Sequence, residues 1–316
     1  MKDVCVIGAG VAGLVAARYL REKFCVTVYE ASPSIGGIWL YNKHETGVKH
    51  TPMYKNLRTN LPKQLMTFRD LPYHKDIPTF LTHGQVMKYL EDYSEKFSIA
   101  DLIQFNTPVT SVKPETSTDP VKWIVSTANG SRLFDAVAIC TGRYDTPHIP
   151  PIKGLDTYTG RYEHSKDYSS PELYEGQHVL IVGAHASGTD LLIDLCEHGV
   201  KADISHRRPE LKVGLTPGVF QYTEPVLFEG DVVYFKGDAE GHRFDVIIFA
   251  TGYDTNLQYL DPDCLIETDV IPRPLYKFAI NPKYPTMAIF NQCVFIAPFP
   301  FSEYQALYFR QILLER

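Results

Sequence analysis

Two glycine-rich turns of the same design stand near the beginning and near the middle of the chain. The first is Gly8-Ala9-Gly10-Val11-Ala12-Gly13, between the apolar run 4–7 and the helix-compatible stretch 14–20. The second is Gly183-Ala184-His185-Ala186-Ser187-Gly188, after the apolar run 179–182. A strand that turns through G-x-G-x-x-G into a helix is the fingerprint of a dinucleotide-binding unit. Two such turns predict an α/β fold with two Rossmann-like domains and two bound nucleotides.

In the first turn each glycine has a separate task. Gly8 permits the tight turn, Gly10 lets backbone N–H groups approach a pyrophosphate, and Gly13 lets the helix lie close to the strand. The pyrophosphate then lies at the positive end of the helix dipole. The next strand, 25–29, is followed by Glu30, seventeen residues beyond Gly13. A carboxylate there accepts hydrogen bonds from the ribose hydroxyls, so an adenosine ribose without a 2′-phosphate is expected.

The second unit carries no acid at the same offset. Ser205 stands seventeen residues after Gly188 and is followed by His206, Arg207 and Arg208. Guanidinium groups bind a 2′-phosphate that a carboxylate would repel, so NADPH is the expected second nucleotide. The alternative is that the two arginines are ordinary solvated loop charges.

His185 occupies the place of the middle glycine in the second turn, where a side chain can crowd the pyrophosphate. Two interpretations stay open. The imidazole either faces outward as a neutral surface group or donates a hydrogen bond to phosphate.

Length and composition fit a two-domain globular protein. The 316 residues suffice for two full cores, and 44% hydrophobic with 22% charged residues is typical of soluble proteins. The net charge of −6 argues against a nucleic-acid partner. The six cysteines form no C-x-x-C pair, so neither a redox dithiol nor a metal site is predicted, and buried free thiols are expected.

No signal peptide precedes the first predicted strand, which begins next to Met1. No apolar run reaches the length of a transmembrane segment. A cytoplasmic protein is the expected default, with a secreted mature form as the alternative, and association into a homo-oligomer stays open.

Three local patterns predict further elements. Thr82 suits the N-cap of a helix whose buried face carries residues 86, 90, 93 and 97. Asn129-Gly130 predicts a hairpin between strands 121–125 and 133–139. The C-terminal stretch 304–314 is predicted to be a helix.

Two strands with similar endings bracket the second fingerprint. One ends in Cys140-Thr141-Gly142 and the other in Ala250-Thr251-Gly252-Tyr253. We therefore expect the second nucleotide domain, 151–250, to be inserted into the first, which would comprise 1–150 and 251–316. The prolines at 147, 150 and 151 indicate a stiff linker at the first crossing.

The segment from Tyr158 to Tyr168 resembles a family signature. It matches the F-x-G-x-x-x-H-x-x-x-(F/Y) pattern of class B flavin-dependent monooxygenases, with Tyr158 in place of Phe. Tyr168 at the last position is similar to the flavin-containing monooxygenases, insect members in particular, whereas Baeyer–Villiger enzymes carry Trp there. Thr59-Asn60 with Pro62-Lys63 resembles the flavin-proximal segment of that family, and 250–253 resembles its A-T-G-Y motif. The resemblance covers essentially the whole chain.

The resemblance implies FAD and NADPH as cofactors and no metal. The implied FAD site comprises Gly8, Ala9, Gly10, Val11, Ala12, Gly13, Glu30, Gly37, Ile38, Trp39, Thr59 and Asn60. The implied NADPH site comprises Ser187, Gly188, Thr189, Asp190, Arg207 and Arg208.

The resemblance also implies a reaction. NADPH would reduce FAD, and the reduced flavin would form a C4a-hydroperoxide with O₂ that oxygenates a soft nucleophile such as an amine, an alkaloid or a sulfide. Asn60 would hydrogen-bond near the flavin and the retained NADP⁺, although by sequence alone it is equally a turn former. His164 is expected to position the interdomain linker.

Other classes stay open. A disulfide reductase of the same architecture is disfavoured by the lack of C-x-x-C, whereas an NADPH oxidase would release H₂O₂. The family usually continues beyond the position of Arg316, so a short form is one expectation. A non-catalytic FAD-binding protein that has lost NADPH use is the remaining alternative.

Overall fold

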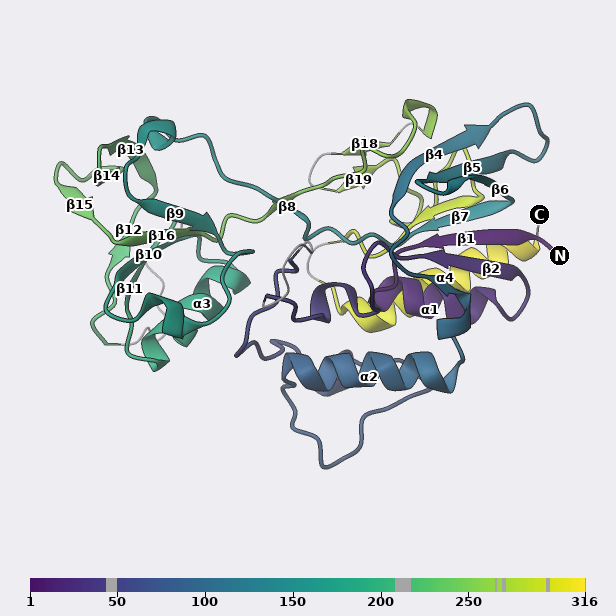
Figure 1. Cartoon of the computed structure of the whole chain (residues 1–316), viewed down its shortest axis with the longest axis horizontal. Helices are drawn as coiled ribbons and strands as arrows, with labels where there is room; N and C mark the ends of the chain where they lie inside the picture. The colour runs from purple at the N-terminus through teal and green to yellow at the C-terminus, as the bar shows by residue number, and fades with distance from the viewer. Residues whose placement is uncertain (44–49, 208–216, 265, 269–270, 294–295, 316) are drawn as a thin grey trace. The chain divides into compact units, whose positions relative to one another are not determined.

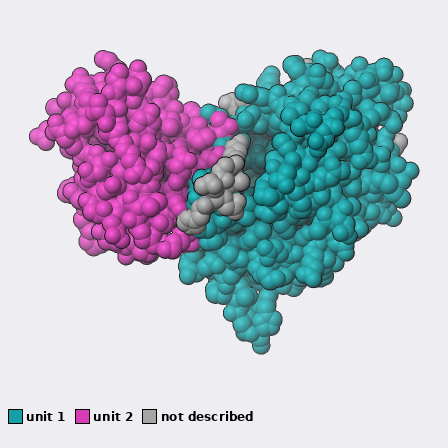
Figure 2. Space-filling view, viewed as in Figure 1, with its two compact units in different colours: residues 1–53, 57–145, 254–316 teal, residues 54–56, 146–253 magenta. Residues whose placement is uncertain are grey.

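The computed structural model describes residues 1–43, 50–207, 217–264, 266–268, 271–293 and 296–315. The chain divides into two compact units, coloured separately in Figure 2. Unit 1 comprises 1–53, 57–145 and 254–316, and unit 2 comprises 54–56 and 146–253. The chain changes unit after Asp145 and after Tyr253, a few residues from the predicted positions. That 54–56 belong with unit 2 was not predicted.

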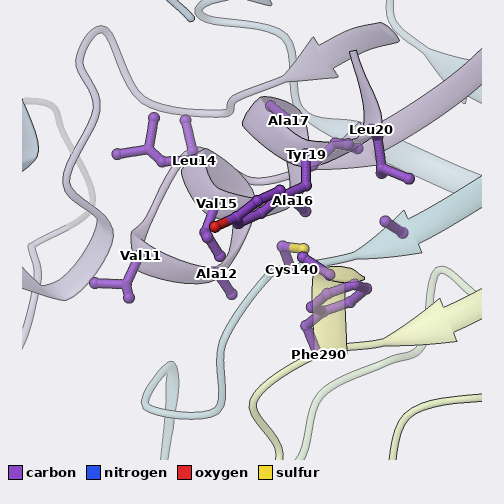
Figure 3. Packing of buried hydrophobic residues seen from close by; sticks show 14 of the residues in the cluster. Val11, Ala12, Leu14, Val15, Ala16, Ala17, Tyr19, Leu20, Cys140 and Phe290 are labelled. Atoms are coloured by element: carbon purple, nitrogen blue, oxygen red, sulfur yellow. The ribbon is translucent and has the colours of Figure 1, made fainter. Parts of the chain in front are cut away.

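Unit 1 is built on a five-stranded parallel sheet in the order β20-β7-β1-β2-β3. Figure 1 labels its central strands β7, β1 and β2. Its strands are β1 (Asp3–Ile7), β2 (Cys25–Tyr29), β3 (Ile103–Gln104), β7 (Ala136–Ile139) and β20 (Met287–Ile289). The central strands are almost wholly apolar because both faces of a parallel sheet are covered. Helices α1 (Val11–Leu20) and α4 (Pro298–Leu314) pack against each other. Every residue of α1 except Arg18 is buried. Figure 3 shows Val15 and Tyr19 of this helix in one cluster with Cys140 and Phe290.

The remaining elements of unit 1 flank this sheet. Helix α2 (His83–Lys96) begins with the predicted cap, in which Gln85 N donates to Thr82 Oγ1 and Thr82 N to Gln85 Oε1. An antiparallel sheet combines β4 (Val109–Glu115), β5 (Lys122–Thr127) and β6 (Gly130–Phe134). The predicted strand 133–139 is wrong as a single element. Its first residues end β6, its last form β7, and Asp135 N between them donates to Asp3 O at 2.8 Å.

Unit 2 has a second five-stranded parallel sheet, in the order β12-β11-β10-β16-β9. Its strands are β9 (Arg161–His164), β10 (His178–Val182), β11 (Lys201–Ser205), β12 (Gln221–Tyr222) and β16 (Val246–Phe249). Helix α3 (Ala186–Glu197) follows β10 through the second glycine turn. An antiparallel sheet of β13 (Pro225–Glu229), β14 (Val232–Phe235) and β15 (Gly241–Arg243) completes the unit. The predicted fold class is confirmed: two Rossmann-like units, the second inserted into the first.

Short elements connect these parts. They are β8 (Thr146–Pro147) paired with β17 (Tyr253–Asp254), β18 (Glu267–Thr268) paired with β19 (Pro272–Arg273), and the 3₁₀ turns η1 (Gly37–Trp39), η2 (Lys63–Leu65), η3 (Ala100–Leu102), η4 (Leu155–Thr157), η5 (Pro171–Tyr174) and η6 (Pro262–Cys264). Helix α4 begins at Pro298 rather than at the predicted residue 304, because proline suits the first helical turn.

No helix in the described ranges is long and apolar enough to cross a membrane. Of the cysteines, Cys25 is exposed, so the expectation of buried thiols holds only in part.

Candidate cofactor sites

The outer glycines of the first turn are required by the protein itself. Gly8 has a φ of +101°, and a Cβ on it would lie 2.6 Å from the carbonyl oxygen of Cys140. A Cβ on Gly13 would lie 1.8 Å from the Gly8 carbonyl oxygen, because α1 approaches the turn so closely. Neither position admits a side chain without moving the backbone.

The second turn repeats this geometry. Gly183 has a φ of +116°, and its Cβ would lie 2.4 Å from the carbonyl oxygen of Ala250. A Cβ on Gly188 would lie 1.8 Å from the Gly183 carbonyl oxygen. Cys140 and Ala250 are therefore equivalent, and each of the two Thr-Gly turns packs against the glycine turn of its own unit.

The middle positions of the two turns differ from the outer ones. Gly10 (φ −78°, ψ −169°) and His185 (φ −88°, ψ −175°) are the N-caps of α1 and α3 and share one backbone conformation. A Cβ on Gly10 would only touch the Cα of Gly37, at 3.5 Å. The protein alone therefore tolerates a side chain here, which explains how His185 fits the second turn without distorting it. His185 is exposed.

Both helix N-termini present backbone donors. Neither N-cap supplies a side-chain acceptor, and neither first turn contains an acidic residue. The first backbone hydrogen bonds of the helices run from Leu14 N to Gly10 O and from Thr189 N to His185 O. The preceding N–H groups, of 11–13 and 186–188, have no partner within their helices and favour an anion. The side chains of Val11 and Ala12 are buried, so these residues contribute backbone only, whereas Ser187 is exposed.

Glu30 ties the end of β2 to the first glycine turn. Its Oε2 accepts from Ala9 N at 2.5 Å, and its Oε1 accepts from Ser32 N at 2.8 Å and Ser32 Oγ at 2.7 Å. The residue is only 9% exposed. A carboxylate accepts about four hydrogen bonds, so Oε2 keeps capacity for a further donor.

The strand register shows which residues are equivalent at the ends of β2 in unit 1 and β11 in unit 2, and it corrects the predicted alignment of these residues. In each unit the first glycine N–H donates at 2.8 Å to the last carbonyl of the second strand, that of Tyr29 or of Ser205. Ser205 is thus the counterpart of Tyr29, and His206 stands where Glu30 stands. The prediction aligned Ser205 with Glu30 because it assumed equal connections, whereas the connection in unit 2 is one residue longer. His206 is buried, and its Nε2 lies 2.9 Å from Gln221 Oε1.

The segment around Gly37 closes against the first turn. Gly36 (φ +112°) donates its N–H to Ala9 O at 3.0 Å, and a Cβ on Gly37 would lie 3.0 Å from the Cα of Gly10. Trp39 is buried in the core of unit 1, while Ile38 is exposed. Among the residues of η1 that were predicted to contact FAD, Gly37 therefore faces the first glycine turn with its backbone. The indole of Trp39 packs into the core of unit 1.

Thr59 and Asn60 differ sharply in their surroundings. Thr59 is buried, and its hydroxyl donates to Leu61 O at 2.8 Å and accepts from Leu81 N at 2.9 Å. Its side chain therefore fixes the loop. Asn60 is exposed, and its amide forms no hydrogen bond with any described residue, so Asn60 is the residue of this pair that can reach a ligand.

The remaining residues of unit 2 that were predicted to contact NADPH differ in their exposure and in their hydrogen-bond partners. Arg207 is exposed, with Nε 4.0 Å from Glu224 Oε2, and Arg208 lies outside the described residues. The Thr189 hydroxyl donates back to His185 O at 3.1 Å. Asp190 stays a predicted nucleotide contact, and its carboxylate accepts a hydrogen bond from Tyr54.

His164 links the signature segment to the second Thr-Gly turn. Its Nδ1 accepts from Lys166 N at 3.0 Å, so Nε2 carries the proton and donates to Gly252 O at 2.9 Å. Burial lowers the pKa of this imidazole.

The pH dependence of stability follows from this arrangement. Because the folded-state pKa of His164 lies below the unfolded value, its stabilisation is complete above about pH 6.5 and is lost as the pH falls through that value. We expect His164→Asn to be less stable than wild type near neutral pH and to lose less stability on acidification. Denaturant unfolding at several pH values measures this, and parallel profiles for the two proteins would contradict it.

Comparisons with known proteins identify the family. The model of the family described as flavin-binding monooxygenase-like matches residues 1–213. The chain is 32% identical over 89% of its length to flavin-containing monooxygenase FMO GS-OX5 of Arabidopsis thaliana and covers 66% of that protein.

Two solved structures are also similar. The S-allyl-L-cysteine S-oxygenase of Allium sativum has a TM-score of 0.88 at 31% identity, and Tmm of a Pelagibacter strain has 0.90 at 25% identity. Both alignments cover 99% of this chain and 76% of the other. None of these three relatives is an insect protein, so the insect subgroup stays a prediction. The family match over 1–213, with both glycine turns inside it, shows that the chain belongs to the flavin-binding monooxygenase-like family.

Proposed function

We propose that the chain is an NADPH-dependent flavin monooxygenase that oxygenates nitrogen or sulfur of a small nucleophile. The observation that carries the proposal is the pair of congruent glycine turns, with a carboxylate beside the first and none at the equivalent place beside the second. One turn thus suits FAD and the other suits a 2′-phosphorylated nucleotide, and the family supplies the reaction class.

The residues of unit 1 fit FAD. A Cβ on Gly10 or Gly37 would fill the narrow space between the two backbones, and the unpartnered N–H groups of the first helical turn suit a pyrophosphate. Glu30 would accept from the ribose. Bound FAD supplies electron transfer from NADPH to O₂. Asn60 would orient the reacting groups by hydrogen bonding, and the surrounding chain would exclude water.

The residues of unit 2 fit NADPH. The first turn of α3 suits the pyrophosphate, Arg207 and Arg208 suit the 2′-phosphate, and His206 at the Glu30 position brings no repelling carboxylate. The likeness to an S-allyl-L-cysteine S-oxygenase at 31% identity supports a sulfur or nitrogen nucleophile as substrate, such as a sulfide, an amine or an alkaloid.

The direct test uses the purified, FAD-loaded protein. Anaerobic NADPH is expected to bleach the flavin, and aerobic turnover with sulfides or amines is expected to yield oxygenated product in proportion to NADPH consumed. H₂O₂ as the sole product with every nucleophile would favour an oxidase. No bleaching by NADPH would favour a non-catalytic flavoprotein.

The nucleotide preference provides a residue-level test. Replacing Arg207 and Arg208 together by Ala is expected to cost roughly 2–4 kcal/mol of the preference for NADPH over NADH, because the paired charge-assisted bonds are lost. Dissociation constants from anaerobic flavin reduction measure it. Arg243→Ala is the matched control, since Arg243 is an exposed arginine of unit 2 that pairs with Asp231. Equal affinities for both nucleotides in the wild type would refute the assignment.

A further inference from the structure

A short segment of unit 2, residues 221–224, connects the end of β11 to the antiparallel sheet of the same unit. On the side of β11, Ser205 pairs with Tyr222 in parallel register, and Ser205 Oγ donates to Thr223 O at 2.6 Å. The next residue of the chain continues this pairing, because His206 N donates to Tyr222 O at 3.0 Å. The segment therefore lies along the carboxyl end of β11.

On its other side the segment holds Lys236, the residue that follows β14. Thr223 Oγ1 donates to Lys236 O at 2.6 Å, and Lys236 N donates to Glu224 O at 2.9 Å. Both hydrogen bonds use backbone atoms of Lys236, so they fix the position of this residue whatever side chain it carries. Lys236 is thus brought near the end of β11, although it lies about thirty residues further along the chain.

One carboxylate joins two cations at this place. Lys236 Nζ donates to Glu224 Oε1 at 2.8 Å, and Arg207 Nε lies 4.0 Å from Glu224 Oε2. The hydrogen bond from Lys236, with the positive charges of Lys236 and Arg207, lowers the pKa of the Glu224 carboxyl. The side chains of Arg207 and Lys236 are 85% and 70% exposed. Ion pairs this exposed contribute little to stability, so both cations are available to a more highly charged ligand.

The location of this cluster indicates which ligand it suits. In a dinucleotide-binding unit, the residues that follow the second strand face the adenosine ribose and, in NADP, its 2′-phosphate. In unit 2 that strand is β11, and Arg207 follows it closely. A phosphate monoester carries nearly two negative charges and three acceptor oxygens, so a guanidinium and an ammonium from different elements can bind it together.

We propose that Lys236 is a further contact of the 2′-phosphate of the second nucleotide, beside Arg207, and that Glu224 is the counter-ion that both cations leave when the phosphate binds. Glu224 accordingly limits the preference for a 2′-phosphorylated nucleotide, because its negative charge opposes the phosphate. The inference rests on the proposed function, which assigns NADPH to unit 2. The three residues all belong to unit 2.

The test measures equilibrium binding and not turnover. The oxidised, FAD-loaded protein is titrated by calorimetry with NADP⁺, with NAD⁺ and with adenosine 2′,5′-bisphosphate, which carries the 2′-phosphate without the nicotinamide. A pH of about 8 keeps that phosphate doubly ionised. In Lys236→Gln we expect NADP⁺ and the bisphosphate to bind about tenfold more weakly than in wild type, and NAD⁺ to bind within about twofold.

Two lysine variants serve as controls. Lys236→Arg keeps the positive charge and is expected to bind NADP⁺ within about threefold of wild type. Lys201→Gln removes an exposed lysine at the amino end of β11, about 13 Å along the strand from Ser205. It is expected to bind all three ligands as wild type does. A loss of NADP⁺ affinity in Lys201→Gln equal to that in Lys236→Gln would overturn the specific role of Lys236.

Glu224→Gln tests the counter-ion. The amide oxygen of Gln can still accept a hydrogen bond from Lys236, whereas the negative charge that opposes the phosphate is lost. We expect NADP⁺ and the bisphosphate to bind about threefold more tightly than in wild type, with NAD⁺ unchanged. An NADP⁺ affinity at or below that of wild type would overturn this role of Glu224.

The outcomes separate this inference from the proposed function. A wild type with equal affinities for NADP⁺ and NAD⁺ would remove the assignment of NADPH to unit 2 and this inference with it. A wild type that prefers NADP⁺, together with an unchanged preference in Lys236→Gln, would overturn the role of Lys236 and leave the proposed function standing. Glu224→Gln tests the same cluster with the lysine intact, so the inference can be overturned even if Lys236→Gln does not fold.

Discussion

Gly13→Ala is expected to abolish folding of unit 1, whereas Gly10→Ala is expected to weaken flavin binding and leave the fold intact. A Cβ on Gly13 would lie 1.8 Å from the Gly8 carbonyl oxygen, so α1 would have to move away from β1. That helix is buried along almost its whole surface, and the cost should exceed about 4 kcal/mol. A Cβ on Gly10 meets the protein only at 3.5 Å, at the Cα of Gly37. In a dinucleotide-binding turn this is the position that a pyrophosphate approaches.

The measurements are denaturant unfolding and visible flavin absorbance. Gly10→Ala should be compared with flavin-free wild type, because loss of a ligand alone lowers apparent stability, and the two should agree within about 1 kcal/mol. Gly84→Ala is the matched control. Gly84 lies in α2 with no heavy atom within 4 Å of an added Cβ, so alanine should stabilise by up to about 1 kcal/mol. A flavin affinity of Gly10→Ala equal to that of wild type would contradict this assignment of the pyrophosphate to the first glycine turn.

The elements that could be predicted from the sequence are those that are determined by residues close to one another in the chain. The capping box at Thr82 is in the structure, and so is the predicted hairpin, since each is decided by neighbouring residues. The hairpin turn is one residue earlier than predicted: Ala128 and Asn129 form it, and Gly130 already pairs with Thr127. The end of the hairpin was misjudged because residues 133–139 are continuously strand-like. Their division between an antiparallel and a parallel sheet is set by partners distant in sequence, Trp123 for Phe134 and Val4 for Ala136.

The candidate site shows the same difference between features set by neighbouring residues and features set by residues distant in sequence. The glycine turns and Glu30 were identifiable because a nucleotide imposes fixed spacing on a β-α-β unit. The alignment of Ser205 with Glu30 was wrong because the connection between the first two strands is one residue longer in unit 2 than in unit 1. Only the strand register reveals this difference. The placement of 54–56 in unit 2 was missed because the contacts of these residues, such as Tyr54 with Asp190, join residues 136 positions apart and follow no period. Asp190 was predicted to contact the nucleotide, and that contact stays a prediction.

The mechanism is most directly tested at Asn60. Its side chain is exposed and unpaired among the described residues, and the neighbouring Thr59 fixes the backbone of the loop. Asn60→Leu keeps roughly the same volume but removes the amide donor and acceptor. FAD content and anaerobic reduction by NADPH should survive, because the phosphate contacts are assigned to the glycine turns and to Arg207 and Arg208.

Coupling is the quantity that should change in Asn60→Leu. If Asn60 orients the reacting groups, its loss should raise the share of NADPH oxidation that ends in H₂O₂ about tenfold or more, which corresponds to the roughly 1.4 kcal/mol of one net hydrogen bond. The measurement is oxygenated product and H₂O₂ per NADPH consumed, in wild type and variant side by side. Asn129→Leu is the matched control, because Asn129 is an exposed asparagine in the hairpin turn of unit 1, away from both glycine turns in the sequence. Unchanged coupling in Asn60→Leu would remove this residue from the mechanism, and an equal loss in Asn129→Leu would attribute the effect to stability rather than to chemistry.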